Sequence, residues 1–468
     1  MQIPVLNGIY TDGVSDFRTS YPKNMVPVPK QQGISEGYLR PAEGIVLQGS
    51  GPGVSRGGIN WNGDCYRVMD TKLVSVSSTG VVTVLGDVGG APGKPVTMDY
   101  SFDRLAISSG GGLYYWKDSV LTMVTDKDLG QVVDFVWVDG YFMTTDGQSL
   151  IVTDLNDPYS VNPLKYGSSE ADPDPVQGLI KLRNEVYAMN RYTIEVFQNV
   201  GGDYFPFERI EGAQMQRGSI GTYTCAMFME NIVFMGGGRN EAPAIWIGSN
   251  SSTAKISTRE IDQIINSYAE STLANCTMEV RVWSGHQFLY VHLPDQTLVY
   301  DGAASQIVNE PVWFVLTTSL VGLGRYRAKD YVWCYDKWNC ADPLSGNIGY
   351  FVNDISSHYG EVNGWEFGTI ILYNEGRGAA FHELELVCLT GNVPVGANPT
   401  IWTSYTVDGQ TWSQERARTA GMQGQRLKRI AWLQQGHMRH WRAQKFRGTS
   451  DAHISVARLE ARIEGLNV

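Results

Sequence analysis

Residues 134–153 read DFVWVDGYFMTTDGQSLIVT, three short apolar runs separated by two Asp-Gly pairs. Glycine reaches the positive φ that a type I′ turn needs, and the twist of this turn matches the twist of the strands beside it. Asp-Gly between apolar runs therefore predicts a β-hairpin. Two such turns in succession predict a three-stranded meander over residues 134–138, 141–145 and 149–153.

Similar units of strands and tight turns recur along the chain. Small sheets repeated every ~40–50 residues are typical of a β-propeller, in which each sheet forms one blade. We predict an all-β fold with a propeller of six or seven blades over residues 57–369; a row of β-sandwiches is the alternative. The units begin near Gly57, Lys94, Val132, Val176, Gly218, Asn275 and Val321.

Two regions flank the repeats in this chain of 468 residues. Residues 1–56 are rich in proline and show little periodicity, which predicts an N-terminal arm or a segment that closes the ring. Residues 370–468 lose the repeat but keep the alternation of apolar and polar side chains, for example over 383–389 and 400–405. Because alternation is typical of half-buried strands, we expect a separate C-terminal domain resembling a β-sandwich.

One helix is predicted inside the array, near residues 258–273. Ser257 and Glu260 have the spacing of a capping box, in which both side chains satisfy free N–H groups of the first turn. Ile261, Ile264 and Ile265 then recur at helical spacing and form an apolar stripe on one face. We expect this stripe to pack on its own blade; docking of a neighbouring subunit is the alternative.

Composition favours a protein of large buried interfaces. The chain has 13 Trp, 24 Tyr and 15 Phe but only 18% charged residues. It contains no apolar run of the ~20 residues that a membrane helix needs, and residues 1–10 lack the pattern of a secretion signal. Its six cysteines include no Cys-x-x-Cys pair. We therefore expect no membrane span, reduced thiols, and assembly in a reducing cytoplasm.

A basic segment stands out in the C-terminal region, although the net charge of the chain is −11. No Asp or Glu occurs between residues 416 and 447. The segment is either a solvated strand face or a contact surface for DNA phosphate or an acidic partner. Its candidate contact residues are Arg416, Arg418, Arg426, Lys428, Arg429, Arg439, Arg442, Lys445 and Arg447.

Motifs for catalysis are scarce. The glycine clusters at 49–53, 110–112 and 236–238 lack the Lys-Ser/Thr of a phosphate-binding loop, and no Gly-x-Ser-x-Gly places a serine for attack. Asp408-Gly409-Gln410-Thr411-Trp412 resembles the Asp-box turn of sialidases, with an Asp-to-Trp spacing one residue short. A propeller glycosidase acting on host surface polysaccharide is therefore the alternative function. We expect no enzyme activity, no catalytic residue, no cofactor and no metal.

Several stretches resemble one family, the packaged-DNA stabilisation proteins (tail hub or tail accessory factors) of short-tailed bacteriophages. The resemblance runs in order and at similar spacing over residues 20–360. It is carried by Asn24–Lys30, Gly37–Arg40, Gly44-Ile45, Gly53–Gly57, Tyr66–Val68, Thr153–Leu155, Thr193–Glu195, Gly221–Tyr223, His292–Asp301 and Asp354–Gly360.

The resemblance implies a virion structural protein of the phage tail, assembled in the host cytoplasm. Family members form a ring, generally taken as a homohexamer, below the portal and its adaptor ring. They close the tail channel, stabilise the packaged DNA, and carry the tail needle and the tailspike or receptor-binding protein. Transient contact with packaged DNA is a further implication, and DNA leaves through such a hub at ejection.

Overall fold

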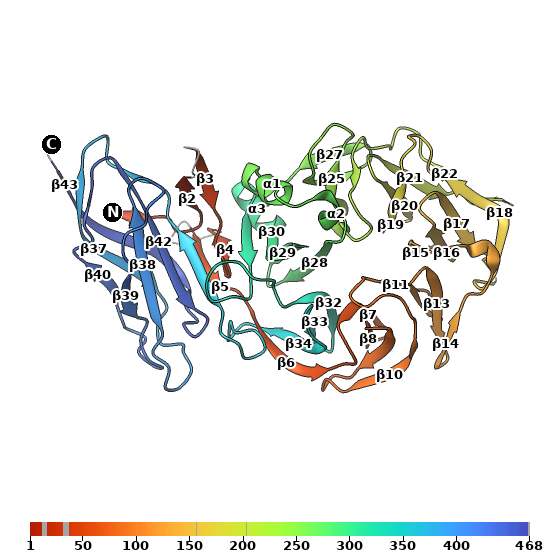
Figure 1. Ribbon diagram of the computed structural model, residues 1–468, viewed down its shortest axis with the longest axis horizontal. Helices are drawn as coiled ribbons and strands as arrows, with labels where there is room; N and C mark the ends of the chain where they lie inside the picture. Colours follow the sequence, from red (N-terminus) through yellow and green to blue (C-terminus); the bar gives the residue numbers. More distant parts are fainter. Residues whose placement is uncertain (12–15, 31–36, 156, 203, 467–468) are drawn as a thin grey trace.

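Short antiparallel strands joined by tight turns make up most of the chain. The computed structural model describes residues 1–11, 16–30, 37–155, 157–202 and 204–466, and parts of the predicted segment 1–56 thus lie outside the described residues. Figure 1 shows a ring of blades on one side and a two-sheet sandwich at the left end. The division of the chain at residues 56–57 and 369–370 stays a prediction.

The described residues form seven small sheets around the ring, within the predicted six or seven. The first four blades are continuous in sequence, and each runs from its innermost to its outermost strand. Their strands are β7 (Ser55–Trp61), β8 (Asp64–Met69), β9 (Lys72–Val76) and β10 (Val82–Asp87); β11 (Thr97–Tyr100), β12 (Leu105–Ser109), β13 (Gly112–Lys117) and β14 (Val120–Met123); β15 (Asp134–Val138), β16 (Tyr141–Thr145), β17 (Ser149–Thr153) and β18 (Val161–Ser168); β19 (Val176–Leu182), β20 (Glu185–Asn190), β21 (Ile194–Asn199) and β22 (Phe207–Arg209).

The last three blades are less regular, and a short 3-10 helix, η1 (Lys127–Leu129), lies between blades 2 and 3. Blade 7 takes its outermost strand, β6, from the N-terminal region and so closes the ring. The strands are β23 (Gly218–Ser219), β24 (Cys225–Phe228), β25 (Asn231–Gly237), β26 (Ala244–Ser249) and β27 (Ser252–Lys255); β28 (Thr277–Trp283), β29 (His286–His292), β30 (Thr297–Asp301) and β31 (Trp313–Leu316); β32 (Lys329–Cys334), β33 (Lys337–Ala341), β34 (Asn347–Val352) and β6 (Gly44–Ser50).

The meander predicted over residues 134–153 is confirmed strand by strand in β15, β16 and β17. Asp139 and Gly140 both have positive φ, 49° and 90°, as a type I′ turn requires. The second Asp-Gly turn differs, because of its two residues only Gly147 has positive φ. Asp146 instead accepts hydrogen bonds from the N–H groups of residues 148 and 149. Local turn chemistry therefore sets this blade.

Carboxylates on the innermost strands join neighbouring blades. Asp99 accepts a hydrogen bond from the Trp137 N–H (2.7 Å), and Asp134 accepts one from the Leu179 N–H (2.8 Å). Burial raises the pKa of Asp134 to about 6. Because such bonds cross from one blade to the next, they fix the blades side by side around the ring.

Three α-helices interrupt the described part of the propeller: α1 (Arg259–Asn266), α2 (Glu270–Leu273) and α3 (Gly302–Val308). The predicted cap is wrong by one residue, because Thr258 is the N-cap and Ser257 hydrogen-bonds Asp262 instead. Ile261 and Ile265 are fully buried in a core shared by blades 5 and 6, as the stripe predicts. Sequence reasoning missed α3. No helix among the described residues is long and apolar enough to cross a membrane.

The C-terminal part of the chain folds as a sandwich of two sheets, and the first strands of the chain join it. The first sheet has the order β4-β5-β43-β37-β40, with β1 on β43 and β41 on β37. The second has the order β35-β42-β38-β39, with β36 on β42. The strands are β1 (Gln2–Ile3), β4 (Met25–Pro29), β5 (Gly37–Pro41), β35 (Gly364–Gly368), β36 (Leu372–Tyr373), β37 (Ala379–Cys388), β38 (Thr400–Thr406), β39 (Arg416–Thr419), β40 (Ile430–Leu433), β41 (His437–Met438), β42 (Trp441–Thr449) and β43 (Val456–Gly465); a separate hairpin pairs β2 (Gly8–Thr11) with β3 (Phe17–Ser20).

Lys23 and Asn24 join the propeller to the sandwich. Lys23 bridges to Val315 on the outermost strand of blade 6 and, on its other side, to Glu366 on β35. Asn24 is buried, and its side-chain amide donates to Thr317 O (2.9 Å) and to Gly364 O (2.7 Å). Its Oδ1 accepts from the Thr317 N–H (3.0 Å). Hydrogen bonding is therefore continuous from a blade of the propeller into one sheet of the sandwich.

Candidate functional site

Residues 416–433 of the basic segment form one long edge of the sandwich, where β39 ends one sheet and β40 ends the other, whereas Arg442, Lys445 and Arg447 lie on the interior strand β42. Arg416 donates to Gln434 O (2.6 Å), and Arg418 donates to Ala431 O (2.8 Å). In return the Trp432 indole N–H donates to Arg416 O (2.9 Å). Two of the nine predicted contact residues thus hold the two edge strands together while their charges remain at the surface.

Three more of the predicted residues form ion pairs within the chain. Arg429 pairs with Glu383 (3.1 Å) and with Glu385, and the guanidinium holds the pKa of Glu385 below its usual value. Arg447 pairs with Glu415 (2.5 Å), and Lys445 lies 3.9 Å from Glu366. The carboxylates come from outside residues 416–447, which is why the segment alone did not reveal them.

Arg442 is fully buried between the two sheets. It donates to Gln435 O (2.6 Å) and to Gln444 Oε1 (2.8 Å), and its guanidinium stacks 3.7 Å from the centre of the Tyr405 ring. Burial lowers the pKa of Arg442 to about 10. A side chain held in this way supports the sandwich core and is closed to DNA or a partner.

Three cations have no partner of their own. The side chains of Arg426, Lys428 and Arg439 make no hydrogen bond or ion pair with any residue that the structure describes, and all three are exposed. Arg426 and Lys428 flank Leu427, which is 97% exposed, in the loop between β39 and β40. We call the exposed surface formed by Arg416, Arg418, Arg426, Leu427, Lys428 and Leu433 the basic edge.

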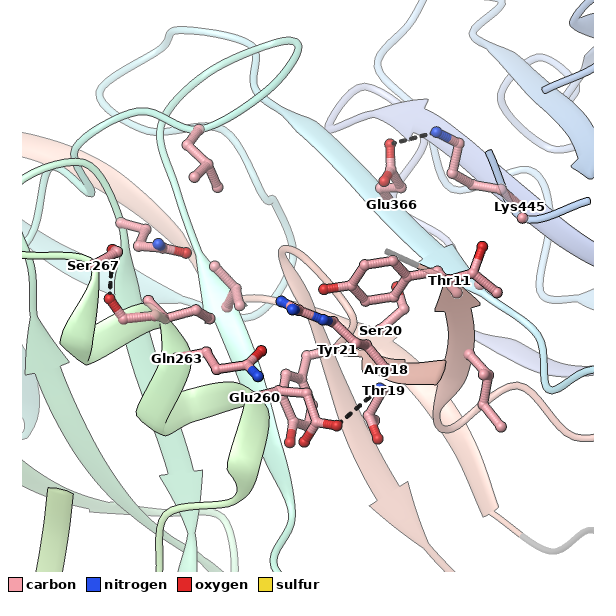
Figure 2. Close-up of a pocket in the computed structure, with 18 of the residues that line it drawn as sticks. Thr11, Arg18, Thr19, Ser20, Tyr21, Glu260, Gln263, Ser267, Glu366 and Lys445 are labelled. Atoms are coloured by element: carbon pink, nitrogen blue, oxygen red, sulfur yellow. Dashed lines mark hydrogen bonds and ion pairs between the residues drawn. The ribbon is translucent and has the colours of Figure 1, made fainter. Parts of the chain in front are cut away.

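A cleft of about 880 Å³ lies where the hairpin β2–β3, helix α1 and the sandwich meet (Figure 2). Glu260 on α1 accepts a hydrogen bond from the Thr19 N–H on β3 (3.3 Å). The Glu366 and Lys445 pair forms part of the sandwich wall. Because the Thr19–Glu260 bond joins the hairpin to helix α1 beside the sandwich wall, the cleft lies at a junction between parts of the chain.

The residues resembling an Asp box form a structural turn. Asp408 accepts hydrogen bonds from the N–H groups of Gln410 (2.9 Å) and Thr411 (2.8 Å) and from the Thr411 hydroxyl (2.5 Å). The Thr411 hydroxyl, with these N–H groups, lowers the pKa of Asp408 below its usual value. Its carboxylate is thus committed to the turn. In the described part of the chain no group of three or more His, Cys, Asp or Glu is placed to hold a metal.

Two family models match consecutive parts of the chain. One, described as the bacteriophage P22 Gp10 β-propeller, matches residues 1–356, and the other, the bacteriophage P22 Gp10 β-sandwich, matches residues 364–464. The chain belongs to the P22 Gp10 family. The predicted family and the all-β fold of a propeller and a β-sandwich are confirmed.

A relative of this Gp10-family chain is the tail hub protein gp10 of Salmonella phage P22. The two are 28% identical over 485 residues, which cover 99% of each chain. The relative gives no support to the glycosidase alternative. Similar solved structures include PorZ of Porphyromonas gingivalis, at 12% identity and a TM-score of 0.40; the match covers 65% of this chain and 37% of that one. The Pan2 WD40 domain of Neurospora crassa is similar at 10% identity and a TM-score of 0.42, and the match covers 66% of this chain and 95% of that one.

Proposed function

We propose that this Gp10-family protein is the tail hub of a short-tailed bacteriophage, a structural part of the virion and not an enzyme. The observation that carries the proposal is the match of both domains, in order, together with a relative named as a tail hub along the full length of the chain. In this proposal the protein assembles in the host cytoplasm as a hexameric ring below the portal and adaptor. There it closes the tail channel and carries the needle and the tailspike or receptor-binding protein.

The fold suits a part that must resist the pressure of packaged DNA. The ring of blades is closed by β6, and Lys23 and Asn24 connect blade 6 to the sandwich by hydrogen bonds. A force applied to the sandwich would therefore pass into the propeller without a flexible linker between them. We propose that the three parts predicted from the sequence, residues 1–56, 57–369 and 370–468, act as one rigid subunit.

We further propose that the uncompensated cations of the sandwich meet an acidic protein neighbour and not DNA. Of the nine predicted contact residues, Arg429, Arg442, Lys445 and Arg447 are engaged within the chain. Arg416 and Arg418 join the edge strands with their charges at the surface, and Arg426 and Lys428, which have no partner among the described residues, flank the exposed Leu427. An apolar residue among cations suits a protein interface better than a phosphate backbone, since phosphate contacts are made by polar and cationic groups.

The test is a phage in which the gene for this protein is deleted. Heads should package DNA but lose it, so that nuclease digests the DNA released from purified particles. Supplying the intact protein should restore protection and place the protein in the tail. If particles without the protein keep their DNA and carry complete tails, the proposal is wrong.

A further inference from the structure

Blade 3 and its connecting loops carry an excess of negative charge. Between Asp118 and Asp174 the only basic residues are Lys127 and Lys165, and Lys165 is paired with Asp154. Six exposed carboxylates in this stretch form no ion pair with any residue in the described part of the chain: Asp118, Asp128, Asp139, Asp146, Asp157 and Glu170. This excess charge is opposite in sign to that of the basic segment of the sandwich.

Three of these carboxylates surround β18, the outermost strand of blade 3. Asp157 precedes β18, Asp146 lies beside its last residues through the pairing of Ser149 with Ser168, and the Asp128 carbonyl accepts a hydrogen bond from Tyr166. Burial raises the pKa of Tyr166, and nearby carboxylates, Asp128 and Asp146 among them, raise it further. Leu164 beside it is 66% exposed. We call the surface formed by Asp128, Asp146, Asp157, Leu164 and Tyr166 the acidic face.

The acidic face and the basic edge lie at opposite ends of the molecule. In Figure 1, β18 is at the far right and β39 and β40 are at the far left. Both surfaces are built on outermost strands, and both expose apolar side chains among charges of one sign. One copy of the chain therefore cannot satisfy its basic edge with its own acidic face.

We propose that the basic edge of one copy docks against the acidic face of the next copy. The proposal rests on the proposed function, because it identifies the surfaces that form the ring. Complementary charge sets the partner and the register of such a contact, and the apolar side chains of both surfaces are buried in it. A contact between different surfaces of identical subunits repeats from copy to copy and closes into a ring when the rotation permits.

The test uses the purified full-length protein and two charge-reversed variants. Arg426→Glu with Lys428→Glu reverses the basic edge, and Asp128→Lys with Asp146→Lys reverses the acidic face. Each variant alone should associate roughly a hundredfold more weakly than the wild-type protein in sedimentation velocity, because like charges then face each other. The wild-type contact should weaken as salt rises, since exposed charges are screened within about 10 Å at 0.1 M.

A chain that combines the reversals and a control variant separate loss of this contact from damage to the fold. A chain carrying all four reversals should regain association, because the reversed surfaces again match. Arg377→Glu changes an exposed cation away from the basic edge and should leave association unchanged. Circular dichroism should be the same for all variants. Asp146→Lys removes the two turn hydrogen bonds that Asp146 accepts and should lower melting slightly, so Asp128→Lys alone, which keeps that turn, should melt like the wild-type protein and also weaken association.

Three outcomes would overturn the inference. One is a wild-type protein that stays monomeric at high micromolar concentration, and another is unchanged association of both reversed variants. The third is binding of duplex DNA that is lost on Arg426→Glu with Lys428→Glu while self-association persists, which would assign the basic edge to phosphate. None of these results depends on DNA retention in phage heads, so they leave the tail-hub role untouched. The DNA outcome would also refute the proposed acidic protein neighbour.

Discussion

Replacing Asn24 with alanine should uncouple the sandwich from the propeller. Asn24 is 5% exposed, and its side chain makes three hydrogen bonds, two to Thr317 and one to Gly364. Its backbone also has φ of 53°, in the left-handed region that asparagine tolerates better than alanine. Asn24→Ala therefore removes three bonds from a buried junction and adds backbone strain.

The expected loss of stability is about 4 kcal/mol. Each lost hydrogen bond removes about 1 kcal/mol, and it leaves a buried backbone N–H or C=O without its partner, which adds to the cost. The left-handed φ adds about 1 kcal/mol for alanine. Asn309 provides a matched control, since it has φ of 56° but is exposed. Asn309→Ala should thus cost about 1 kcal/mol, the strain alone.

Urea unfolding and scanning calorimetry measure both variants. We expect Asn24→Ala to lower the unfolding free energy and to separate the thermal transition into two, because the propeller and the sandwich then melt independently. Asn24→Gly should relieve the backbone strain and recover only a minor part of the loss. If Asn24→Ala costs no more than Asn309→Ala, then the side-chain bonds do not couple the two parts, and this reasoning fails.

Three further predictions concern the core, pH and a close contact. Ile265→Asp should lower the unfolding free energy by about 4 kcal/mol, because it places a charge in a closed core. Ile264 is half-buried, so Ile264→Asp should lower it by about 2 kcal/mol. Equal melting temperatures of the two variants would contradict this. Burial lowers the pKa of His358 to about 3, whereas an unfolded histidine titrates near about 6.5, so the folded state loses stability as pH falls between these values. Urea midpoints should fall more steeply from pH 6.5 to 4 for the wild-type protein than for His358→Gln, and parallel slopes would exclude this role. Gly409 has φ of +77°, and the methyl group of Gly409→Ala would overlap Thr11 on β2, so this variant should lower the unfolding free energy by about 3 kcal/mol. Gly63→Ala, which also has positive φ but lies in open space, should lower it by about 1 kcal/mol. Equal unfolding free energies of the two variants would show that the contact with β2 relaxes freely.

Local patterns predicted the blades well, because their turns are determined by neighbouring residues. The strands over 134–153 have the predicted bounds, and the stripe at Ile261 and Ile265 is buried as expected. The cap was misplaced because Ser257 and Thr258 are adjacent and both can accept the same type of bond. Choosing between them depends on Asp262, which captures the Ser257 hydroxyl.

Contacts between distant residues could not be predicted in this way. The pairing of β1 with β43 joins the two ends of the chain, and no local pattern specifies it. The ion-pair partners of Arg429 could have been suspected from the spacing of two glutamates in the sequence. Glu383 and Glu385 lie two residues apart on one strand and therefore face the same side, so their carboxylates together form a site for one cation, which is Arg429.

The pairing of β5 with β43 means that one sheet of the sandwich can be completed only late in synthesis. β5 leaves the ribosome early, but its partner β43 is among the last strands to be made, since Leu39 pairs with Val456. At about 5–20 residues per second, roughly 20 to 80 s separate the two. During that time the propeller can fold blade by blade while one sheet of the sandwich lacks its central strand. A polypeptide that stops before residue 456 therefore lacks β43 and cannot complete this sheet of the sandwich.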